Sequence, residues 1–124
     1  MAHIINLKTF KDTRGILTVL DRVVDFDIKR LFYIYAVDDS DRGGHRHHNT
    51  HQAAICIQGS CKITNNDSKK TEVFDLDTPD KCLILEPEDW HVMHDFSADA
   101  ILLVLASTPF DPKDYIYEPY PDSI

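Results

Sequence analysis

The sequence lacks long hydrophobic runs. Its longest apolar stretch, AILLVLA at residues 100–106, is far shorter than the roughly 20 residues that a membrane-spanning helix requires. The N-terminal residues MAHIINLKTF have neither the apolar core nor the cleavage-site pattern of a secretion signal. From these absences we expect a soluble, cytoplasmic protein with no membrane partner.

Positive charge is also scarce, because 13 lysines and arginines stand against 21 aspartates and glutamates, for a formal net charge of −8. This charge repels the backbone of nucleic acids and anionic membrane surfaces, so neither is an expected partner. A small anionic ligand remains compatible with the sequence if arginines gather at one pocket. The 3 cysteines form no CxxC pair, and their odd number favours free thiols in a reducing compartment.

A helical period is absent as well, since no segment keeps a 3.6-residue hydrophobic repeat for more than about ten residues. Short β-type runs alternate instead with turn sequences such as DDSDRGG and TNNDSKK. This pattern predicts one all-β domain spanning residues 1–124, an antiparallel sandwich or a small barrel, with little helix and a proline-rich tail that lies extended on its surface. The expected strands cover residues 3–7, 15–21, 30–37, 52–58, 60–64, 71–76, 81–86, 90–96, 100–107 and 114–120.

Histidine, in contrast, is concentrated in one place: four histidines lie within residues 45–51, in the segment HRHHNTH. Side chains two apart in a strand share a face, so His45 and His47 should project together into whatever the sheet encloses. Arg46 and His48 should face away. Two imidazoles on one inner face indicate a site rather than a packed core.

The spacing around these histidines matches the first cupin motif, G(x)5HxH(x)4E(x)6G, from its HxH onward, with Gln52 in place of glutamate. Farther along, EPEDWH puts His91 at the position of the third cupin histidine. Three imidazoles can hold Zn²⁺, Fe²⁺ or Ni²⁺, but the missing carboxylate disfavours a metal, and we expect none. Proton transfer by His45 and His47 suits an imidazole pKa of about 6.5 better. Histidines that only bind carbonyls in the barrel mouth are the remaining interpretation.

The chain as a whole resembles the nucleotide-linked sugar 3,4-ketoisomerases of the FdtA/QdtA type, a metal-independent branch of the cupins also labelled WxcM-like. The resemblance implies a cupin fold, which is an RmlC-like double-stranded β-helix or jelly-roll barrel. It also implies a homodimer with exchanged N-terminal strands and a dTDP-linked 4-keto-6-deoxyhexose as substrate, with no cofactor. The similarity is carried by DTRGILTVLD, IKRLFYIYAVDDSDRGGHRHHNTHQ, CIQGSCKI, EPEDWHVMHDFSADAILLVLAS and DPKDYI.

The resemblance implies roles for single residues. It places the catalytic pair on His45 and His47, and the active-site tyrosine on Tyr33. Arg14 and His91 match the two positions that distinguish the branch that forms the galacto product. Two departures remove positive charge, because His48 replaces a lysine and Tyr117 replaces an arginine.

Binding of the substrate is expected to involve arginine and small side chains. The pyrophosphate should meet Arg14, Arg42 and Arg46, because planar guanidinium groups suit phosphate oxygens. Gln52 should point inward on the face that also carries Ala54 and Cys56, whose small size leaves room for a hexose ring.

The expected reaction moves a ketone from C4 to C3 through an enediol. One of His45 and His47 would be the carbon base, and the other, coupled to Tyr33, would move protons between O3 and O4. The product would serve the biosynthesis of 3-amino-3,6-dideoxyhexoses of surface glycans. Three alternatives stay open: a gluco product, a three-histidine metal-dependent cupin enzyme, and a nucleotide-sugar-binding cupin without catalysis.

Overall fold

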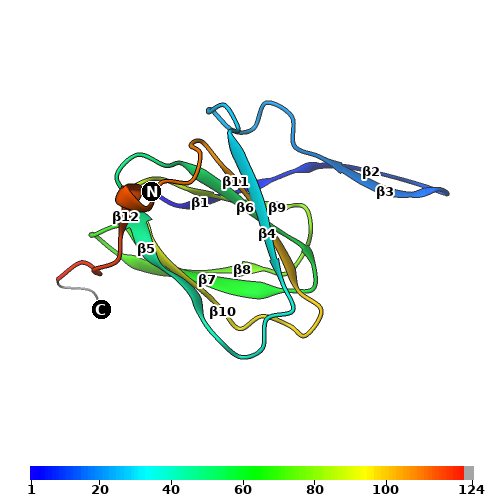
Figure 1. The fold of residues 1–124 in the computed structure, drawn as a ribbon. Helices are drawn as coiled ribbons and strands as arrows, with labels where there is room; N and C mark the ends of the chain where they lie inside the picture. The colour runs from blue at the N-terminus through cyan, green and yellow to red at the C-terminus, as the bar shows by residue number, and fades with distance from the viewer. Residues whose placement is uncertain (122–124) are drawn as a thin grey trace.

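The computed structural model describes residues 1–121, which form β-strands joined by turns and a short 3₁₀ helix (Figure 1). The expected domain of residues 1–124 includes residues 122–124, which lie outside the described residues. The elements are β1 (His3–Asn6), β2 (Lys8–Asp12), β3 (Gly15–Val19), β4 (Arg30–Tyr35), β5 (Arg42–His47), β6 (Gln52–Gln58), β7 (Cys61–Asn66), β8 (Thr71–Leu76), β9 (Lys81–Leu85), β10 (Trp90–His94), β11 (Ile101–Ala106), η1 (Pro112–Asp114) and β12 (Tyr115–Ile116).

Two five-stranded antiparallel sheets form the body of the molecule, in the orders β1-β9-β6-β11-β4 and β12-β5-β10-β7-β8. The sheets face each other as the two walls of a flattened barrel (Figure 1). Sheet neighbours are mostly distant in sequence, since β1 pairs with β9 and β5 pairs with β10. The expectation of an all-β chain with little helix is confirmed.

The apolar core has two parts, one on each face of the first sheet. Strand β6 contributes to both, because Ala54 and Cys56 point between the sheets while Ala53 and Ile55 point to the other side. Burial on both faces explains why this strand reads as a continuous apolar run rather than an alternating one. The outer part is covered by the segment that follows β3, through Leu20, Val23, Val24 and Phe26.

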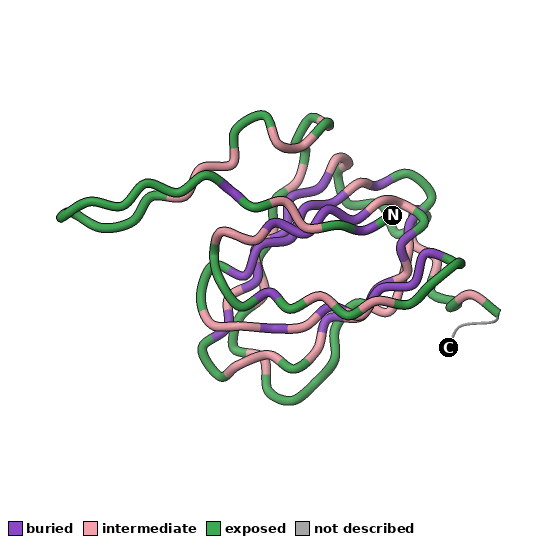
Figure 2. Tube along the Cα trace, turned by 180° about the vertical axis from the view of Figure 1, so that it is seen from behind, coloured by how far each residue is buried: buried purple, intermediate pink, exposed green. Residues whose placement is uncertain are grey.

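A hairpin of β2 and β3 projects away from the barrel (Figure 1), and these two strands pair only with each other. Every residue of β2 is exposed, as Figure 2 shows for most of the hairpin. Phe10, Ile16 and Leu17 are 53%, 64% and 59% exposed. The expected strand ranges omitted β2, because a strand with no buried face carries no alternating pattern.

A second exposed apolar surface lies on the outer side of β4, β6 and β11, formed by Leu31, Tyr33, Tyr35, Ile57, Ile101 and Leu103. We call it the outer apolar face.

The three cysteines are free and buried. Within residues 1–121, no helix is long and apolar enough to cross a membrane.

The C-terminal segment returns to the barrel after β11. The short helix η1 begins after Asp111, whose side chain accepts a hydrogen bond from the Lys113 backbone amide and caps the helix. Strand β12 then pairs with the edge of β5, with Tyr115 opposite His47. The expected extended tail is therefore tied down at the edge of a sheet, directly beside the histidines.

Candidate active site

Three histidines meet between the two sheets. His45 and His47 point inward from β5, and His91 comes from β10, where it lies opposite His45 in the ladder. The ring centroid of His45 is 5.0 Å from that of His47 and 5.1 Å from that of His91, and the latter two are 6.4 Å apart. The strand alternation thus brings together the three histidines that the sequence singled out.

A glycine makes this close approach possible. Gly43 has a φ of +85°, and a Cβ built on it would lie 3.0 Å from the backbone oxygen of His91. The ladder between β5 and β10 is also irregular at this point. A larger residue at position 43 would strain the backbone and push the two histidine-bearing strands apart.

A carboxylate orients His47 from the C-terminal segment. The Nδ1–H of His47 donates to Oδ2 of Asp114 at 2.9 Å, and their side chains are only 2% and 7% exposed. Asp114 also accepts hydrogen bonds from the Asn49 backbone amide at 2.8 Å and from the Thr50 hydroxyl. With Nδ1 bearing the proton, Nε2 of His47 is left as a lone-pair acceptor, and this buried atom has no partner among the described residues.

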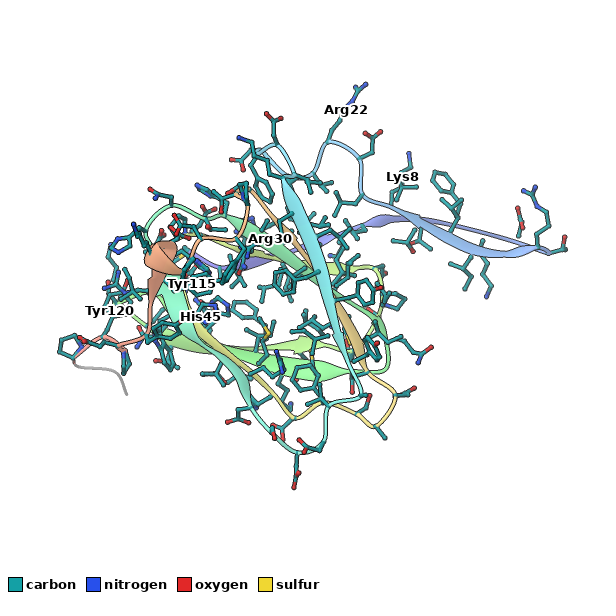
Figure 3. The ribbon with its side chains drawn as sticks, in the orientation of Figure 1. Lys8, Arg22, Arg30, His45, Tyr115 and Tyr120 are labelled. Atoms are coloured by element: carbon teal, nitrogen blue, oxygen red, sulfur yellow. The ribbon has the colours of Figure 1, made fainter. Side chains whose placement is uncertain are left out.

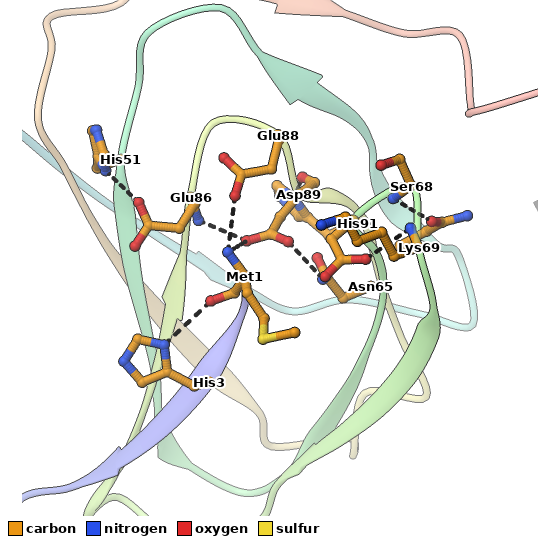
Figure 4. A network of polar contacts seen from close by, with 12 residues as sticks. Met1, His3, His51, Asn65, Ser68, Lys69, Glu86, Glu88, Asp89 and His91 are labelled. Atoms are coloured by element: carbon orange, nitrogen blue, oxygen red, sulfur yellow. Dashed lines mark hydrogen bonds and ion pairs between the residues drawn. The ribbon is translucent and has the colours of Figure 1, made fainter.

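A separate polar network holds His91 (Figure 4). The Nδ1–H of His91 donates to the backbone oxygen of Asp89 at 3.0 Å, which again leaves a buried, unpartnered Nε2 within the described chain. The Asp89 carboxylate is fully buried and accepts hydrogen bonds from the Asn65 side chain at 2.9 Å and the Glu86 backbone amide at 2.8 Å. The turn that carries His91 is therefore fixed by bonds that do not involve its reactive nitrogen.

Burial keeps these imidazoles neutral. It lowers the pKa of His45 to about 4, with a further contribution from the neighbouring His91, and it lowers the pKa of His91 to about 4. Burial also lowers the pKa of His47, although Asp114 opposes this shift. Burial raises the pKa of Asp114, but its hydrogen bonds from Thr50, Asn49 and His47 outweigh that effect and hold the pKa below its usual value. The site thus pairs neutral bases with an ionised carboxylate.

A cavity of about 170 Å³ opens beside His45, with walls from both sheets. Gln52 lies in its wall with the side chain almost fully buried, and its Oε1 has no hydrogen-bond partner among the described residues. An unpaired buried acceptor is costly unless a ligand or water occupies the space beside it. The lining residues are Phe32, Ile34, Arg42, Gly43, His45, Gln52, Met93 and Tyr115.

Two side chains that the sequence did not single out complete this region. The ring centroid of Tyr115 is 4.7 Å from those of His45 and His47. Arg30, at the start of β4, donates from Nη1 to the Tyr115 hydroxyl at 3.3 Å. Figure 3 shows Arg30, Tyr115 and His45 on the same side of the barrel.

Tyr33, which was expected to be catalytic, does not line the cavity within one chain. The inward positions of β4 are Phe32 and Ile34, and Tyr33 lies between them on the opposite face. It is 59% exposed and stacks on Tyr35 with ring centroids 6.0 Å apart. The two-residue alternation of the strand makes an inward position for Tyr33 incompatible with inward Phe32 and Ile34.

Of the three arginines expected at the pyrophosphate, only Arg42 lines the cavity. Arg14 lies at the tip of the projecting hairpin, with a side chain that is 88% exposed and an ion pair to Asp12 at 2.7 Å. Arg46 faces outward from β5, and its guanidinium lies 4.6 Å from the ring centroid of Tyr120. Within one chain, Arg14 and Arg46 therefore do not contribute to the cavity.

A metal site does not emerge from the side-chain arrangement. Across residues 1–121, no group of three or more histidine, cysteine, aspartate or glutamate side chains is arranged to hold a metal ion. The fourth cupin position is filled by Gln52, which supplies a neutral oxygen. The donors present fit an acid–base site better than a divalent cation.

Asp114, Tyr115 and Arg30 were missed because no motif spacing links them to the histidines. Asp114 and Tyr115 are 67 and 70 positions after His47 and His45, and only the pairing of β12 with β5 brings them close. A signal was present in the segment DPKDYI, which belongs to the pattern of the resembled family. Arg30 lies on the same face of β4 as Phe32 and Ile34, so an inward placement of these two residues would have identified it from the sequence.

Comparison with known proteins gives consistent matches over nearly the whole chain. The family model described as FdtA, WxcM-like, C-terminal, matches residues 1–121. A curated TDP-4-oxo-6-deoxy-alpha-D-glucose-3,4-oxoisomerase from Aneurinibacillus thermoaerophilus is 38% identical over 116 residues, covering 91% of this chain and 84% of the relative.

Solved structures of similar proteins share the fold. The WlaRB TDP-quinovose 3,4-ketoisomerase from Campylobacter jejuni superposes with a TM-score of 0.90 at 41% identity, over 94% of this chain and 92% of that one. A histidine-to-asparagine variant of the 3,4-ketoisomerase QdtA from Thermoanaerobacterium thermosaccharolyticum, in complex with TDP-4-keto-6-deoxyglucose, gives 0.89 at 38% identity, over 94% and 87%. The fold is the cupin jelly-roll barrel, as expected.

Proposed function

We propose a specific reaction for this chain, which belongs to the WxcM-like FdtA family of sugar-nucleotide 3,4-ketoisomerases and is an isomerase. The reaction is the conversion of dTDP-4-keto-6-deoxyglucose to its 3-keto isomer through an enediol. The observation that supports it best is the cavity beside His45, where a neutral imidazole and an unpaired Gln52 oxygen meet. A base and a hydrogen-bonding group on one small polar cavity are what an enolisation needs.

His45 is the carbon base in this proposal. It is the one of the three histidines that lines the cavity, while His47 and His91 lie against its ring on other sides. A pKa of about 4 leaves it free to accept a proton, and a bound anionic diphosphate nearby would raise that pKa toward neutrality, because negative charge favours the imidazolium. His45 would take the proton from C3, exchange it with solvent, and deliver a proton to C4.

His47 supports this step from behind. Its proton-bearing Nδ1 is held by Asp114, so Nε2 faces the cluster as an acceptor. His47 packs against the ring of His45, and the Asp114 carboxylate beside it stabilises the positive charge that His45 gains as it takes the C3 proton. Gln52 accepts a hydrogen bond from a sugar hydroxyl, and Arg42 at the cavity wall binds a phosphate oxygen.

The same chemistry leads to a proposal for the product. A single base that acts on one ring face and returns the proton to C4 on that face sets the C4 hydroxyl axial, which is the galacto configuration. Arg14 and His91 are the pair found in the galacto-forming branch. His91 is buried against His45 and can fix the orientation of that ring toward the lower face of the sugar.

Arg14 can serve a site only in another copy of the chain. It sits at the tip of a hairpin that leaves its own barrel, and that hairpin exposes Phe10, Ile16 and Leu17. A homodimer that exchanges these N-terminal strands would bury the apolar side chains and bring Arg14 to the substrate of the partner.

Together with three buried free thiols, a nucleotide-linked substrate suits a cytoplasmic enzyme of 3-amino-3,6-dideoxyhexose biosynthesis for surface glycans.

Incubation of the purified protein with dTDP-4-keto-6-deoxyglucose in deuterated water tests the reaction. We expect the 3-keto sugar, with deuterium entering at C4, by NMR, and a 6-deoxygalactose configuration after reduction. Binding of dTDP without deuterium uptake would instead indicate a binding protein. Activity that disappears with a chelator and returns with a metal would refute the acid–base mechanism.

Mixing of two variants tests the exchanged dimer. Arg14→Ala and His45→Asn should each be impaired alone, whereas co-refolding at equal amounts should restore about a quarter of the wild-type activity, since half of the dimers then carry one intact site. A mixture no more active than its components would show that Arg14 acts within its own chain or not at all.

Calorimetry with dTDP, UDP and GDP tests the nucleotide specificity, with dTDP expected to bind most tightly.

A further inference from the structure

Tyr115 is the hydroxyl-bearing residue of the cavity wall. The other lining side chains offer an imidazole, an amide, a guanidinium, a thioether or hydrocarbon. Tyr117 is 64% exposed, and Tyr33 and Tyr35 lie on the outer apolar face. An enediol with two adjacent oxygens needs a group that can both give and take a proton at oxygen, and a phenol is such a group.

The position of Tyr115 is set by backbone pairing. Strand β12 adds to the edge of β5, with Tyr115 opposite His47 and Ile116 opposite Arg46. The same turn of chain supplies Asp114, so the orientation of His47 and the placement of Tyr115 depend on one short segment. The Tyr115 ring is equally close to His45 and His47, at 4.7 Å between centroids.

Arg30 determines how the phenol is hydrogen-bonded. Its Nη1 donates to the Tyr115 oxygen at 3.3 Å, so the tyrosine acts as acceptor in that bond and keeps its own proton available. Within residues 1–121 no hydrogen bond takes that proton. The guanidinium is itself held over the rings of Phe32 at 5.6 Å and Phe110 at 5.7 Å, and it would stabilise a phenolate formed beside it.

We propose that Tyr115 is the oxygen-side acid and base of the reaction and that Arg30 positions it, an inference that rests on the proposed function. As His45 takes the C3 proton, the C3–H electrons form the C3=C4 bond, and O4 takes the phenolic proton. The phenolate, stabilised by Arg30, then takes the O3 proton. The O3–H electrons form the C3=O bond, and C4 takes the proton from His45. Both residues end as they began, so no further reactant is required.

The alternative is a purely structural role for Tyr115 in packing the histidines. The two roles differ in what happens to the enediol. Loss of the hydroxyl alone keeps the ring contacts with His45 and His47, but it removes the proton path between O4 and O3. The intermediate would then return to the starting ketone more often than it proceeds.

The test uses Tyr115→Phe, with Tyr35→Phe as matched control, in the full-length protein with dTDP-4-keto-6-deoxyglucose in deuterated water. We expect kcat for Tyr115→Phe to fall by about 10²-fold or more, with affinity for dTDP changed by less than about threefold. The amount of deuterium at C3 of the recovered substrate, divided by the amount of 3-keto product formed, should rise.

Arg30→Lys and Arg30→Met extend the test. Lysine keeps a positive donor and should retain more activity than methionine, while both keep dTDP binding. Tyr115→Phe with wild-type kcat, or with lower kcat but an unchanged exchange ratio, would overturn the role of Tyr115. Wild-type protein that does not isomerise the sugar would overturn the proposed function and this inference with it, whereas an active wild type with an active Tyr115→Phe variant refutes this inference alone.

Discussion

Two histidine–carboxylate pairs of nearly equal length occupy opposite environments. The Nδ1 of His47 is 2.9 Å from Asp114 in the barrel, and the Nδ1 of His94 is 2.8 Å from Asp95 outside it. The inner carboxylate is 7% exposed and the outer one 66%. Contact geometry alone therefore does not distinguish a working pair from a surface pair.

The partners of the second imidazole nitrogen also differ. Nε2 of His94 contacts the Thr64 hydroxyl at 2.6 Å, so both of its nitrogens are occupied. Nε2 of His47 is buried and unpartnered among the described residues. A base needs a free lone pair next to space for a substrate, and the inner pair packs against His45, which lines the cavity.

The largest effect should follow removal of the inner imidazoles. His45→Asn or His47→Asn should keep the fold, because a cavity wall tolerates the change better than a packed core, and should lower kcat by about 10² to 10⁴. Turnover is measured by NMR and folding by circular dichroism. Full activity in both variants would contradict the assignment.

Asp114→Asn should come next. The neutral amide no longer stabilises the positive charge that His45 gains next to His47, so kcat should fall by about 10- to 100-fold while KM changes little. The Asn49 and Thr50 donors also lose a charged acceptor, which should cost about 1 to 3 kcal/mol of unfolding free energy. An unchanged ¹⁵N spectrum of His47 in this variant would argue against the orienting role.

Acid should destabilise the protein through the inner histidines. The pKa of His45 and His91 falls from 6.5 to about 4 on folding, so the unfolded chain binds more protons between these values. The contribution of these histidines to the unfolding free energy should be fully present above about pH 6.5 and should decrease toward pH 4, by up to about 1.4 kcal/mol per pH unit for each group.

Two carboxyl groups modify this slope in opposite directions. The lowered pKa of Asp114 adds a loss of stability only as the pH falls below its usual value of 3.8, whereas burial raises the pKa of Asp89 and opposes the loss at higher pH. Urea midpoints at pH 7.5, 5 and 3.5 measure the balance, and His45→Asn should flatten the dependence between the first two. Equal slopes in the variant and the wild type would show that His45 does not cause the pH dependence of stability.

The outer pair should give the smallest effect. Asp95→Asn or His94→Asn should change kcat by less than about twofold and the unfolding free energy by about 0 to 1 kcal/mol, because exposed ion pairs contribute little. Assay of these variants beside Asp114→Asn completes the comparison. A loss comparable to that of the inner pair would mean that burial is not what separates them.

The sequence predicted the parts of the molecule that follow from local periodicity. The all-β class, the inward direction of His45 and His47 and the outward direction of Arg46 follow from two-residue alternation, and the inward direction of Gln52 follows from the cupin motif spacing. The third histidine followed from motif spacing, and it does lie against the other two.

The remainder depends on contacts that local patterns do not encode. Tyr33 was assigned by resemblance within LFYIY, where a shift of one residue exchanges the inner and outer faces. Asp114 and Tyr115 reach the site through the pairing of β12 with β5, and Arg30 reaches it from β4, whose Phe32 and Ile34 line the cavity. Arg14 was placed at the substrate, but the hairpin that carries it projects from its own barrel.

The order of strands in the two sheets bears on how the protein folds. His45 and His91 become neighbours only when β5 meets β10, and Asp114 and Tyr115 arrive only when the end of the chain docks on β5. Pairings between distant segments form slowly, because the intervening chain must first be ordered. Recovery of activity after dilution from denaturant should therefore coincide with, or trail, the slowest recovery of β-structure, so that the active site itself reports complete folding.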